Sequence, residues 1–231
     1  MTPTSSEKQF GDLFASRFRE GAFDSIVGPR HGPLIGEVSL IQGRPDFVCA
    51  TYPARQSSRQ RAERIGNVIS SSSAASVLGY LKPNAARTTD YVQAKTGLPR
   101  SRFQSIVSDL RTERLINTKI SSNNQILLTS NLPPAELYVF ELKLEKWQRA
   151  VFQALQYRVA ANRVAIVMPS DRIHRIEPHA HKLREFGVGV VSLDWEDGSV
   201  NTIIHPRKSR PLSLRHHYVA LGNYLKSIPQ N

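Results

Sequence analysis

The feature that most constrains the fold is an alternation of strand-like and helix-like segments in the C-terminal part of the chain. Residues 137–144, 163–168 and 188–193 are mostly apolar runs of strand length, and residues 146–162 and 177–186 between them have helical patterning. Strands that are joined through a single helix pair in parallel, and a parallel sheet needs cover on both faces. The sequence therefore predicts an α/β fold whose sheet is flanked by helices.

An amphipathic helix and a hairpin are predicted near the N-terminus. Thr4 and Glu7 fit a capping box at the start of this helix. Two strand-like runs, residues 33–41 and 45–52, follow it and are joined through a tight turn at residues 42–44. The apolar face of the helix recurs at helical spacing and consists of Phe10, Leu13, Phe14 and Phe18.

Basic charge is concentrated in the middle of the chain. Residues 54–131 carry 12 basic and 4 acidic side chains, whereas residues 1–53 carry 5 and 6 and residues 132–231 carry 14 and 9. The net charge of +12 suits a polyanionic partner, with nucleic acid first and an anionic membrane surface second. Because both edges of the middle segment are linker-like, the sequence predicts an inserted module, residues 54–133, between core segments 1–53 and 134–231.

Several protein classes are excluded by what the sequence lacks. Cys49 is the single cysteine, which excludes internal disulfides and cysteine-based zinc clusters. There is no Gly-rich phosphate loop of the Walker or dinucleotide type, which argues against ATP-driven or NAD chemistry. No apolar run reaches the ~18 residues of a spanning helix, and the N-terminus lacks the plan of a signal peptide. We therefore expect a cytoplasmic protein with no membrane partner.

Three charged residues fall on predicted strands. Glu141 and Lys143 are two residues apart, so their side chains project from the same face of the sheet. Asp46 joins them if the second hairpin strand lies beside residues 137–144. Two carboxylates bind Mg²⁺ through oxygen, and a lysine beside them can orient water or offset charge on a phosphate. Unpaired charges in an apolar strand are costly to bury, which favours a functional site over a salt bridge at a sheet edge.

This set resembles the motif of the PD-(D/E)xK nuclease superfamily, which has the restriction-endonuclease-like fold. The resemblance is carried by Pro45-Asp46 after the hairpin turn and by Glu141-Leu142-Lys143. It implies a metal-dependent nuclease in DNA repair or defence, a hydrolase with Mg²⁺ or Mn²⁺ held by Asp46 and Glu141. One departure from the family pattern is the separation of 95 residues between Asp46 and Glu141. In the family, the hairpin and the acidic-x-Lys strand are usually neighbours in sequence. An inserted module accounts for that separation.

Gln153 and Tyr157 form a Gln-x-x-x-Tyr pattern, which follows the acidic-x-Lys motif in several families of this superfamily. Residues four apart lie on one helix face, so the resemblance implies that both point at the site and hold a phosphate or Lys143. A helix whose Gln and Tyr merely border the core explains the pattern equally well. Many members also carry a metal-linked glutamate on the first helix, for which Glu7 is the candidate and Glu37 an alternative.

The middle segment resembles a winged helix-turn-helix. Residues 88–96 and 99–115 have helical patterning on either side of Gly97, and residues 117–129 have the pattern of a hairpin with its tip at 121–124. One face of the second helix is polar and basic, which suits base edges and phosphates in a DNA major groove. The candidate DNA-binding residues are Arg100, Ser101, Arg102, Gln104, Ser105, Ser108 and Arg111.

The complete prediction is an α/β, restriction-endonuclease-like mixed sheet flanked by helices and interrupted by a small winged-helix domain, acting on DNA. Its main rival is a DNA-binding regulator that keeps the nuclease-like fold and has lost turnover. Winged helices also mediate dimer and protein contacts, so a homodimer or a subunit of a larger complex stays open.

Overall fold

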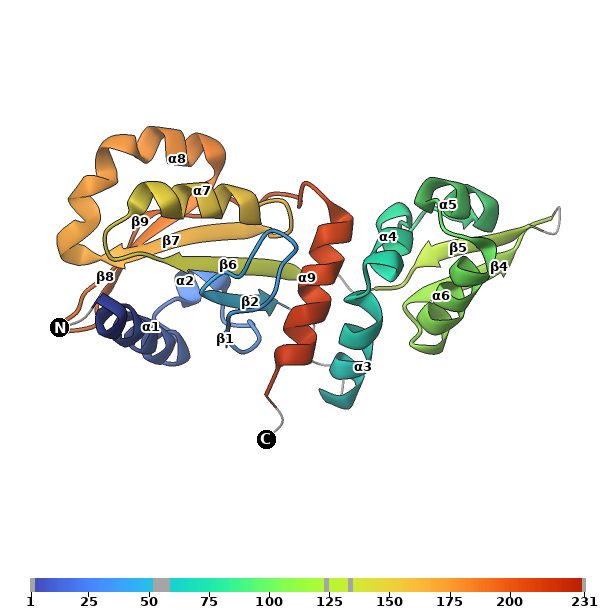
Figure 1. The fold of residues 1–231 in the computed structure, drawn as a ribbon, viewed down its shortest axis with the longest axis horizontal. Coiled ribbons are helices and arrows are strands. Elements are labelled where there is room, and N and C mark those ends of the chain that lie inside the picture. Colours follow the sequence, from blue (N-terminus) through green and yellow to red (C-terminus); the bar gives the residue numbers. More distant parts are fainter. Residues whose placement is uncertain (1–2, 52–58, 123–124, 133–134, 230–231) are drawn as a thin grey trace. The chain divides into compact units, whose positions relative to one another are not determined.

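The chain divides into two compact units that do not follow one another along the sequence. A computed structural model describes residues 3–51, 59–122, 125–132 and 135–229 (Figure 1). The first unit consists of Met1–Tyr52 with Ala135–Leu212, and the second of Pro53–Pro134 with Ser213–Asn231. None of the helices in the described part of the chain is long and apolar enough to cross a membrane.

The first unit contains a six-stranded mixed sheet, which confirms the predicted α/β class. Three central strands are parallel, as expected from the helices that join them, and the strands at both edges are antiparallel. In spatial order the strands are β1 (Ile35–Gly36), β2 (Phe47–Thr51), β6 (Glu136–Leu142), β7 (Arg163–Pro169), β8 (Val188–Leu193) and β9 (Val200–Ile204).

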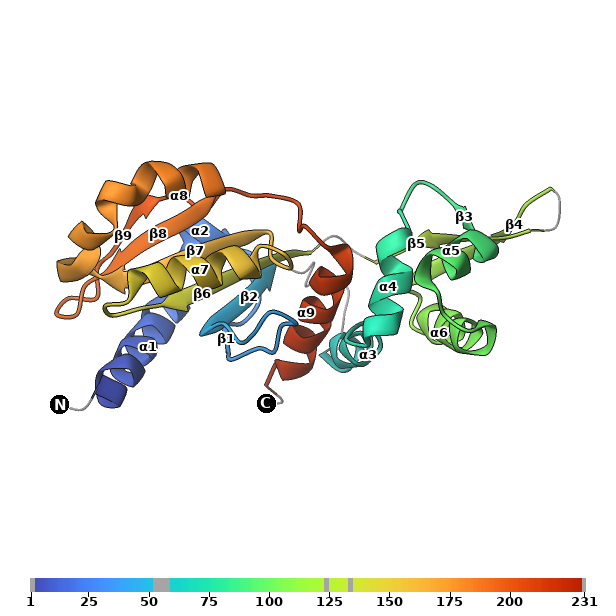
Figure 2. The same ribbon diagram turned by 45° about the horizontal axis from the view of Figure 1, so that its top comes forward.

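Helices cover both faces of this sheet (Figures 1 and 2). On one face lie α1 (Pro3–Arg19) and the short α2 (Asp24–Val27), and on the other α7 (Trp147–Tyr157) and α8 (Ala180–Phe186). Between β7 and α8 the chain forms two short 3₁₀ segments, Ser170–Arg175 and Glu177–His179.

The predicted apolar face of α1 forms the core on its side of the sheet. Phe14 is fully buried, and its ring lies 4.8 Å from that of Phe23 and 5.3 Å from that of Phe140 on β6. Phe10 and Phe18 are equally inaccessible, and Leu13 packs at the edge. Burying each such ring contributes about 1.5–3 kcal/mol, so the helix is held on the sheet by its apolar face.

Two predictions for the N-terminal segment are wrong in detail. Helix α1 begins at Pro3, so Thr4 lies within the helix rather than at the position before it that a capping box requires. The first hairpin strand is limited to Ile35–Gly36 because Glu37 adopts a left-handed backbone conformation with φ 52°. Its amide still donates to the Asp46 carbonyl at 3.1 Å, so the hairpin holds Asp46 in place.

The second unit contains a small antiparallel sheet and five helices in the described residues. The two helices around Gly97 and the hairpin that follows them form as predicted; residues 123–124 at the predicted tip lie outside the described residues. The strands have the order β3 (Arg87–Thr88), β5 (Ile126–Ser130) and β4 (Ile116–Ile120). The helices are α3 (Arg59–Ile69), α4 (Ser72–Tyr80), α5 (Thr89–Thr96), α6 (Arg100–Thr112) and α9 (Leu214–Ser227).

The structure differs from the sequence-based division at the C-terminal helix, which belongs to the second unit. Helix α9 packs on α3 and α4, and two glycines allow the closest approach. A Cβ on Gly222 would lie 2.5 Å from the Ser70 amide nitrogen, and one on Gly66 would lie 2.9 Å from the Gly222 carbonyl. Backbone packs against backbone here, which no other residue permits. The inserted segment is therefore completed by residues from the far end of the chain.

Candidate functional site

Strand pairing brings Asp46 next to Glu141 and Lys143. Strand β2 pairs antiparallel with β6, and Phe47 lies opposite Phe140. Asp46 directly precedes β2, and its Oδ2 accepts a hydrogen bond from the Leu142 amide at 2.6 Å. The structure therefore confirms that the second hairpin strand lies beside the strand of the acidic-x-Lys motif, although 95 residues separate Asp46 from Glu141 in the sequence.

Lys143 lies between the two carboxylates. Its Nζ is 2.9 Å from Glu141 Oε1 and 3.9 Å from Asp46 Oδ2. The Glu141 side chain is 1% exposed, that of Lys143 is 19% exposed and that of Asp46 is 39% exposed. The Glu141 carboxylate therefore lies at the buried end of the site, and the Asp46 carboxylate lies at the end that solvent reaches. Lys143 follows the last residue of β6, but its amide still donates to the Val167 carbonyl at 3.0 Å, so the backbone is fixed here too.

Both carboxyl groups are destabilised in their charged form. Burial raises the pKa of Glu141, and the charge of Asp46 raises it further, against the opposing effect of Lys143. Burial also raises the pKa of Asp46, which Lys143 and the Leu142 amide lower. A nearby positive charge offsets both the cost of burying the two carboxylates and their mutual repulsion. The pair of Asp46 and Glu141 is therefore suited to binding a cation.

Gln153 and Tyr157 from α7 are brought to the same site. Tyr157 is 1% exposed. Burial, followed by the charge of Glu141, raises the pKa of Tyr157 to about 12, against the opposing effect of Gln153. A Cβ on Gly43 would lie 3.7 Å from the Tyr157 hydroxyl, so the hairpin turn also approaches it. The shared helix face that the sequence predicts for Gln153 and Tyr157 therefore faces Glu141.

Buried oxygens at this site lack partners. Within the described residues, Glu141 Oε2 and Gln153 Oε1 are buried without a hydrogen-bond partner, and so is Gln42 Oε1 in the hairpin turn. An unsatisfied buried polar atom costs free energy and calls for an explanation such as a bound ion. Sequence reasoning missed Gln42, whose only signal is its position next to Gly43 in the hairpin turn.

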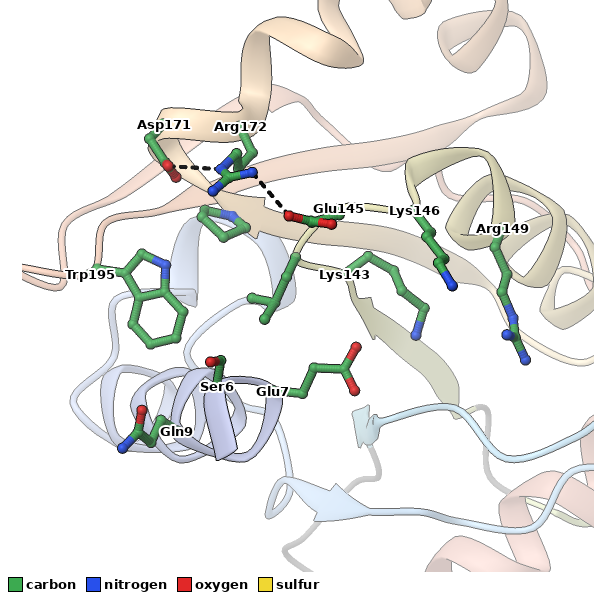
Figure 3. Close-up of a pocket in the computed structure, with 12 residues that line it drawn as sticks. Ser6, Glu7, Gln9, Lys143, Glu145, Lys146, Arg149, Asp171, Arg172 and Trp195 are labelled. Carbon is green, nitrogen blue, oxygen red and sulfur yellow. Dashed lines mark hydrogen bonds and ion pairs between the residues drawn. The ribbon is translucent and has the colours of Figure 1, made fainter. Parts of the chain in front are cut away.

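Glu7 and Glu37 lie at the rim. Both are exposed, and both line a cavity of about 250 Å³ together with Asp46 and Lys143. Their charges also raise the pKa of Asp46, after the effect of burial. Figure 3 shows the Glu7 carboxylate pointing toward the Lys143 ammonium. The structure thus places both glutamate candidates beside the pair, but neither is buried with it.

The two carboxylates, Asp46 and Glu141, have the oxygen donors that a hard divalent cation prefers. Two carboxylates supply oxygen ligands, and the partnerless Glu141 Oε2 is an unused one. In the described part of the chain, no group of three or more His, Cys, Asp or Glu side chains is arranged to hold a metal ion. A cation at Asp46 and Glu141 would therefore keep water among its ligands, as Mg²⁺ usually does.

A second candidate site lies on α6 in the second unit. Phe103, Ile106 and Leu110 are buried, as the helical pattern predicts. The seven residues predicted to contact DNA all lie on the exposed side of the helix: Arg100, Ser101, Arg102, Gln104, Ser105, Ser108 and Arg111. This face is thus accessible, polar and basic.

No protein-family model matches this sequence, and a search against curated proteins found no match.

Proposed function

We propose that the first unit is a metal-dependent nuclease of the PD-(D/E)xK type with the restriction-endonuclease-like fold, and that it hydrolyses DNA phosphodiester bonds. The observation that carries this proposal is that the Lys143 ammonium lies within 4 Å of both the Asp46 and the Glu141 carboxylates. The lysine bridges two carboxylates whose pKa values are both raised. Such perturbed groups gathered in one place are typical of functional sites.

Each residue has a role that follows from its contacts. Asp46 and Glu141 would hold Mg²⁺ or Mn²⁺, which would supply a Lewis acid at the scissile phosphate. The Leu142 amide fixes the Asp46 carboxylate. The Lys143 ammonium, held by Glu141, can orient a water or offset the negative charge that develops on the phosphate. Tyr157 and Gln153 would orient Glu141 from α7.

A cleavage assay tests the proposal directly. Purified protein is incubated with end-labelled linear, circular, single-stranded and forked DNA in the presence of Mg²⁺, Mn²⁺ or EDTA. We expect cleavage with either metal and none with EDTA. Binding without cleavage under every condition would instead favour the inactive DNA-binding regulator.

Gln153→Ala should lower cleavage by roughly 10- to 100-fold, the usual effect of removing a group that orients a metal ligand. It should change the melting temperature little, because Gln153 is only half-buried. The matched control is Gln148→Ala, which removes an exposed glutamine from the same helix. Cleavage rates and thermal unfolding are measured on both variants. A large loss of melting temperature with unchanged specific activity would mean that Gln153 only borders the core.

We propose that the second unit is a winged helix-turn-helix that binds DNA through α6. Its support is the order of elements from α4 to β5, in which α5 and α6 are joined through Gly97 and are followed by the β4–β5 hairpin. The charge of residues 54–131 favours DNA over a protein contact. Because α9 completes this unit, a fragment of residues 66–131 would lack part of its packing, and the full chain is the proper material for tests.

Arg102→Ala in the full chain should weaken DNA binding about equally for all sequences. The slope of log K against log salt should shrink by about one if Arg102 contacts a phosphate. Lys82→Ala is the control, since it removes an exposed charge of the same unit away from α6. Fluorescence anisotropy at several salt concentrations gives both quantities. An unchanged slope and affinity would remove α6 from the DNA interface.

A further inference from the structure

A larger cavity, of about 810 Å³, adjoins the carboxylate site. It shares Glu7, Lys143 and Leu144 with the small cavity at Asp46. Its walls come from α1 and from the segments that follow three neighbouring parallel strands, β6, β7 and β8. This is the edge of an α/β sheet at which ligands characteristically bind.

The two ends of this cavity differ in chemistry. Figure 3 shows Trp195 at one end and Lys146 and Arg149 at the other, with Lys143 between them. Arg172 on the wall is already paired, with Glu145 Oε1 at 3.2 Å and Asp171 Oδ2 at 2.9 Å.

The acidic residues of that wall are therefore neutralised. Lys146 and Arg149 are both exposed, and within the described residues neither takes part in the ion pairs that Arg172 forms with Glu145 and Asp171. An anionic group fits this end, whereas the opposite end offers an aromatic ring.

Trp195 is held in position before any ligand arrives. Its ring packs on Phe10, with 5.0 Å between the ring centres, yet the residue stays 38% exposed. Its turn is fixed by Asp194, whose Oδ1 accepts from the Glu196 amide at 2.8 Å and whose Oδ2 accepts from the Ser170 hydroxyl. Because the Trp195 ring is already fixed and partly exposed, it loses little conformational entropy when a flat group stacks on it.

We propose that this cavity binds an unpaired segment of single-stranded DNA, with one base stacked on Trp195 and the phosphate of a neighbouring nucleotide at Lys146 and Arg149. The inference rests on the proposed nuclease function, because it names the form of DNA that the adjoining site would cut. Duplex bases are already stacked on their neighbours, so only an unpaired base offers its face to Trp195. Two strand spacings, about 10 Å, separate the backbone of β6 from that of β8, so the turn that carries Trp195 follows a strand that is not adjacent to the strand of Glu141.

Tryptophan fluorescence isolates this contact. The chain has two tryptophans, so Trp147→Phe leaves Trp195 as the sole emitter. Titrating this variant with a short oligothymidine strand in EDTA should quench its emission, and a blunt duplex of equal length should quench it far less. Trp195→Ala should weaken single-strand affinity roughly tenfold, the scale of one lost stacking contact. Trp195→Phe should restore most of that affinity.

The outcomes separate this inference from the nuclease proposal. Absence of quenching in Trp147→Phe, or an equal loss of single-strand and duplex affinity in Trp195→Ala, overturns the nucleotide site. The quenching test keeps Trp195 intact, so it holds even if Trp195→Ala fails to fold. Single-strand quenching in a protein that cleaves nothing with any metal supports the nucleotide site and overturns the nuclease.

Discussion

Lys143→Met is expected to bind Mn²⁺ and DNA and yet to lose about 10²- to 10³-fold of its turnover, the range seen when one charged group that stabilises a transition state is removed. Methionine keeps the aliphatic stem and removes only the ammonium. That ammonium lies 2.9 Å from Glu141 and 3.9 Å from Asp46, where it competes with a metal ion for the same oxygens. Metal affinity should therefore stay equal or increase, whereas an interaction made only in the transition state lowers kcat.

The measurement is calorimetry of Mn²⁺ binding beside a cleavage assay on the same protein. Lys182→Met on α8 is the matched control, since it removes an exposed lysine outside the site. Without metal, Lys143→Met leaves Glu141 buried without its cation, so Glu141 takes up a proton more readily and the melting temperature falls. Added Mn²⁺ should restore that stability. Cleavage at the wild-type rate would exclude a role of Lys143 in the reaction.

The central sheet could be predicted because its signals are local. Apolar runs with helices between them specify parallel strands, and the phenylalanines of α1 recur on one helical face. The convergence of Asp46 and Glu141 is implied by the family resemblance rather than by this pattern, because nothing local requires the strand after Asp46 to pair with β6 across 95 residues. Helical spacing predicts that Gln153 and Tyr157 share one helix face, and only the family resemblance turns that face toward the site. Site residues on regular elements are thus accessible to sequence reasoning.

Other features depend on contacts that a sequence pattern does not encode. Helix α9 has an apolar face, but nothing in its sequence tells which unit buries it; Gly66 and Gly222, 156 residues apart, meet only in three dimensions. Glu37 adopts φ 52° because of its tertiary setting, since the local pattern favours a strand there. Trp195 lies in a turn after β8, and its place beside Lys143 depends on the order of the strands.

Glu141→Gln should abolish metal binding and lower cleavage by at least about 10³-fold, because a ligand worth several kcal/mol is lost. Glutamine preserves the shape of a side chain that is 1% exposed, whereas Glu141→Ala would add a cavity to the loss of charge. Burial already disfavours the charged carboxylate and raises the pKa of Glu141, but the amide leaves the Lys143 ammonium without its partner at 2.9 Å. We therefore expect the melting temperature of the metal-free protein to fall, and to fall less than in Glu141→Ala.

Asp46→Asn completes the test, because its amide oxygen can still accept from the Leu142 amide while its charge is gone. It should lose metal binding and cleavage as Glu141→Gln does, and Asp46→Ala should do so with added loss of stability. Glu185→Gln, an exposed change on α8, controls for the altered net charge. If the neutral variants bind Mn²⁺ as the wild type does, or if the wild type binds none, Asp46 and Glu141 hold no catalytic cation. DNA binding without turnover would then be the activity that the fold supports.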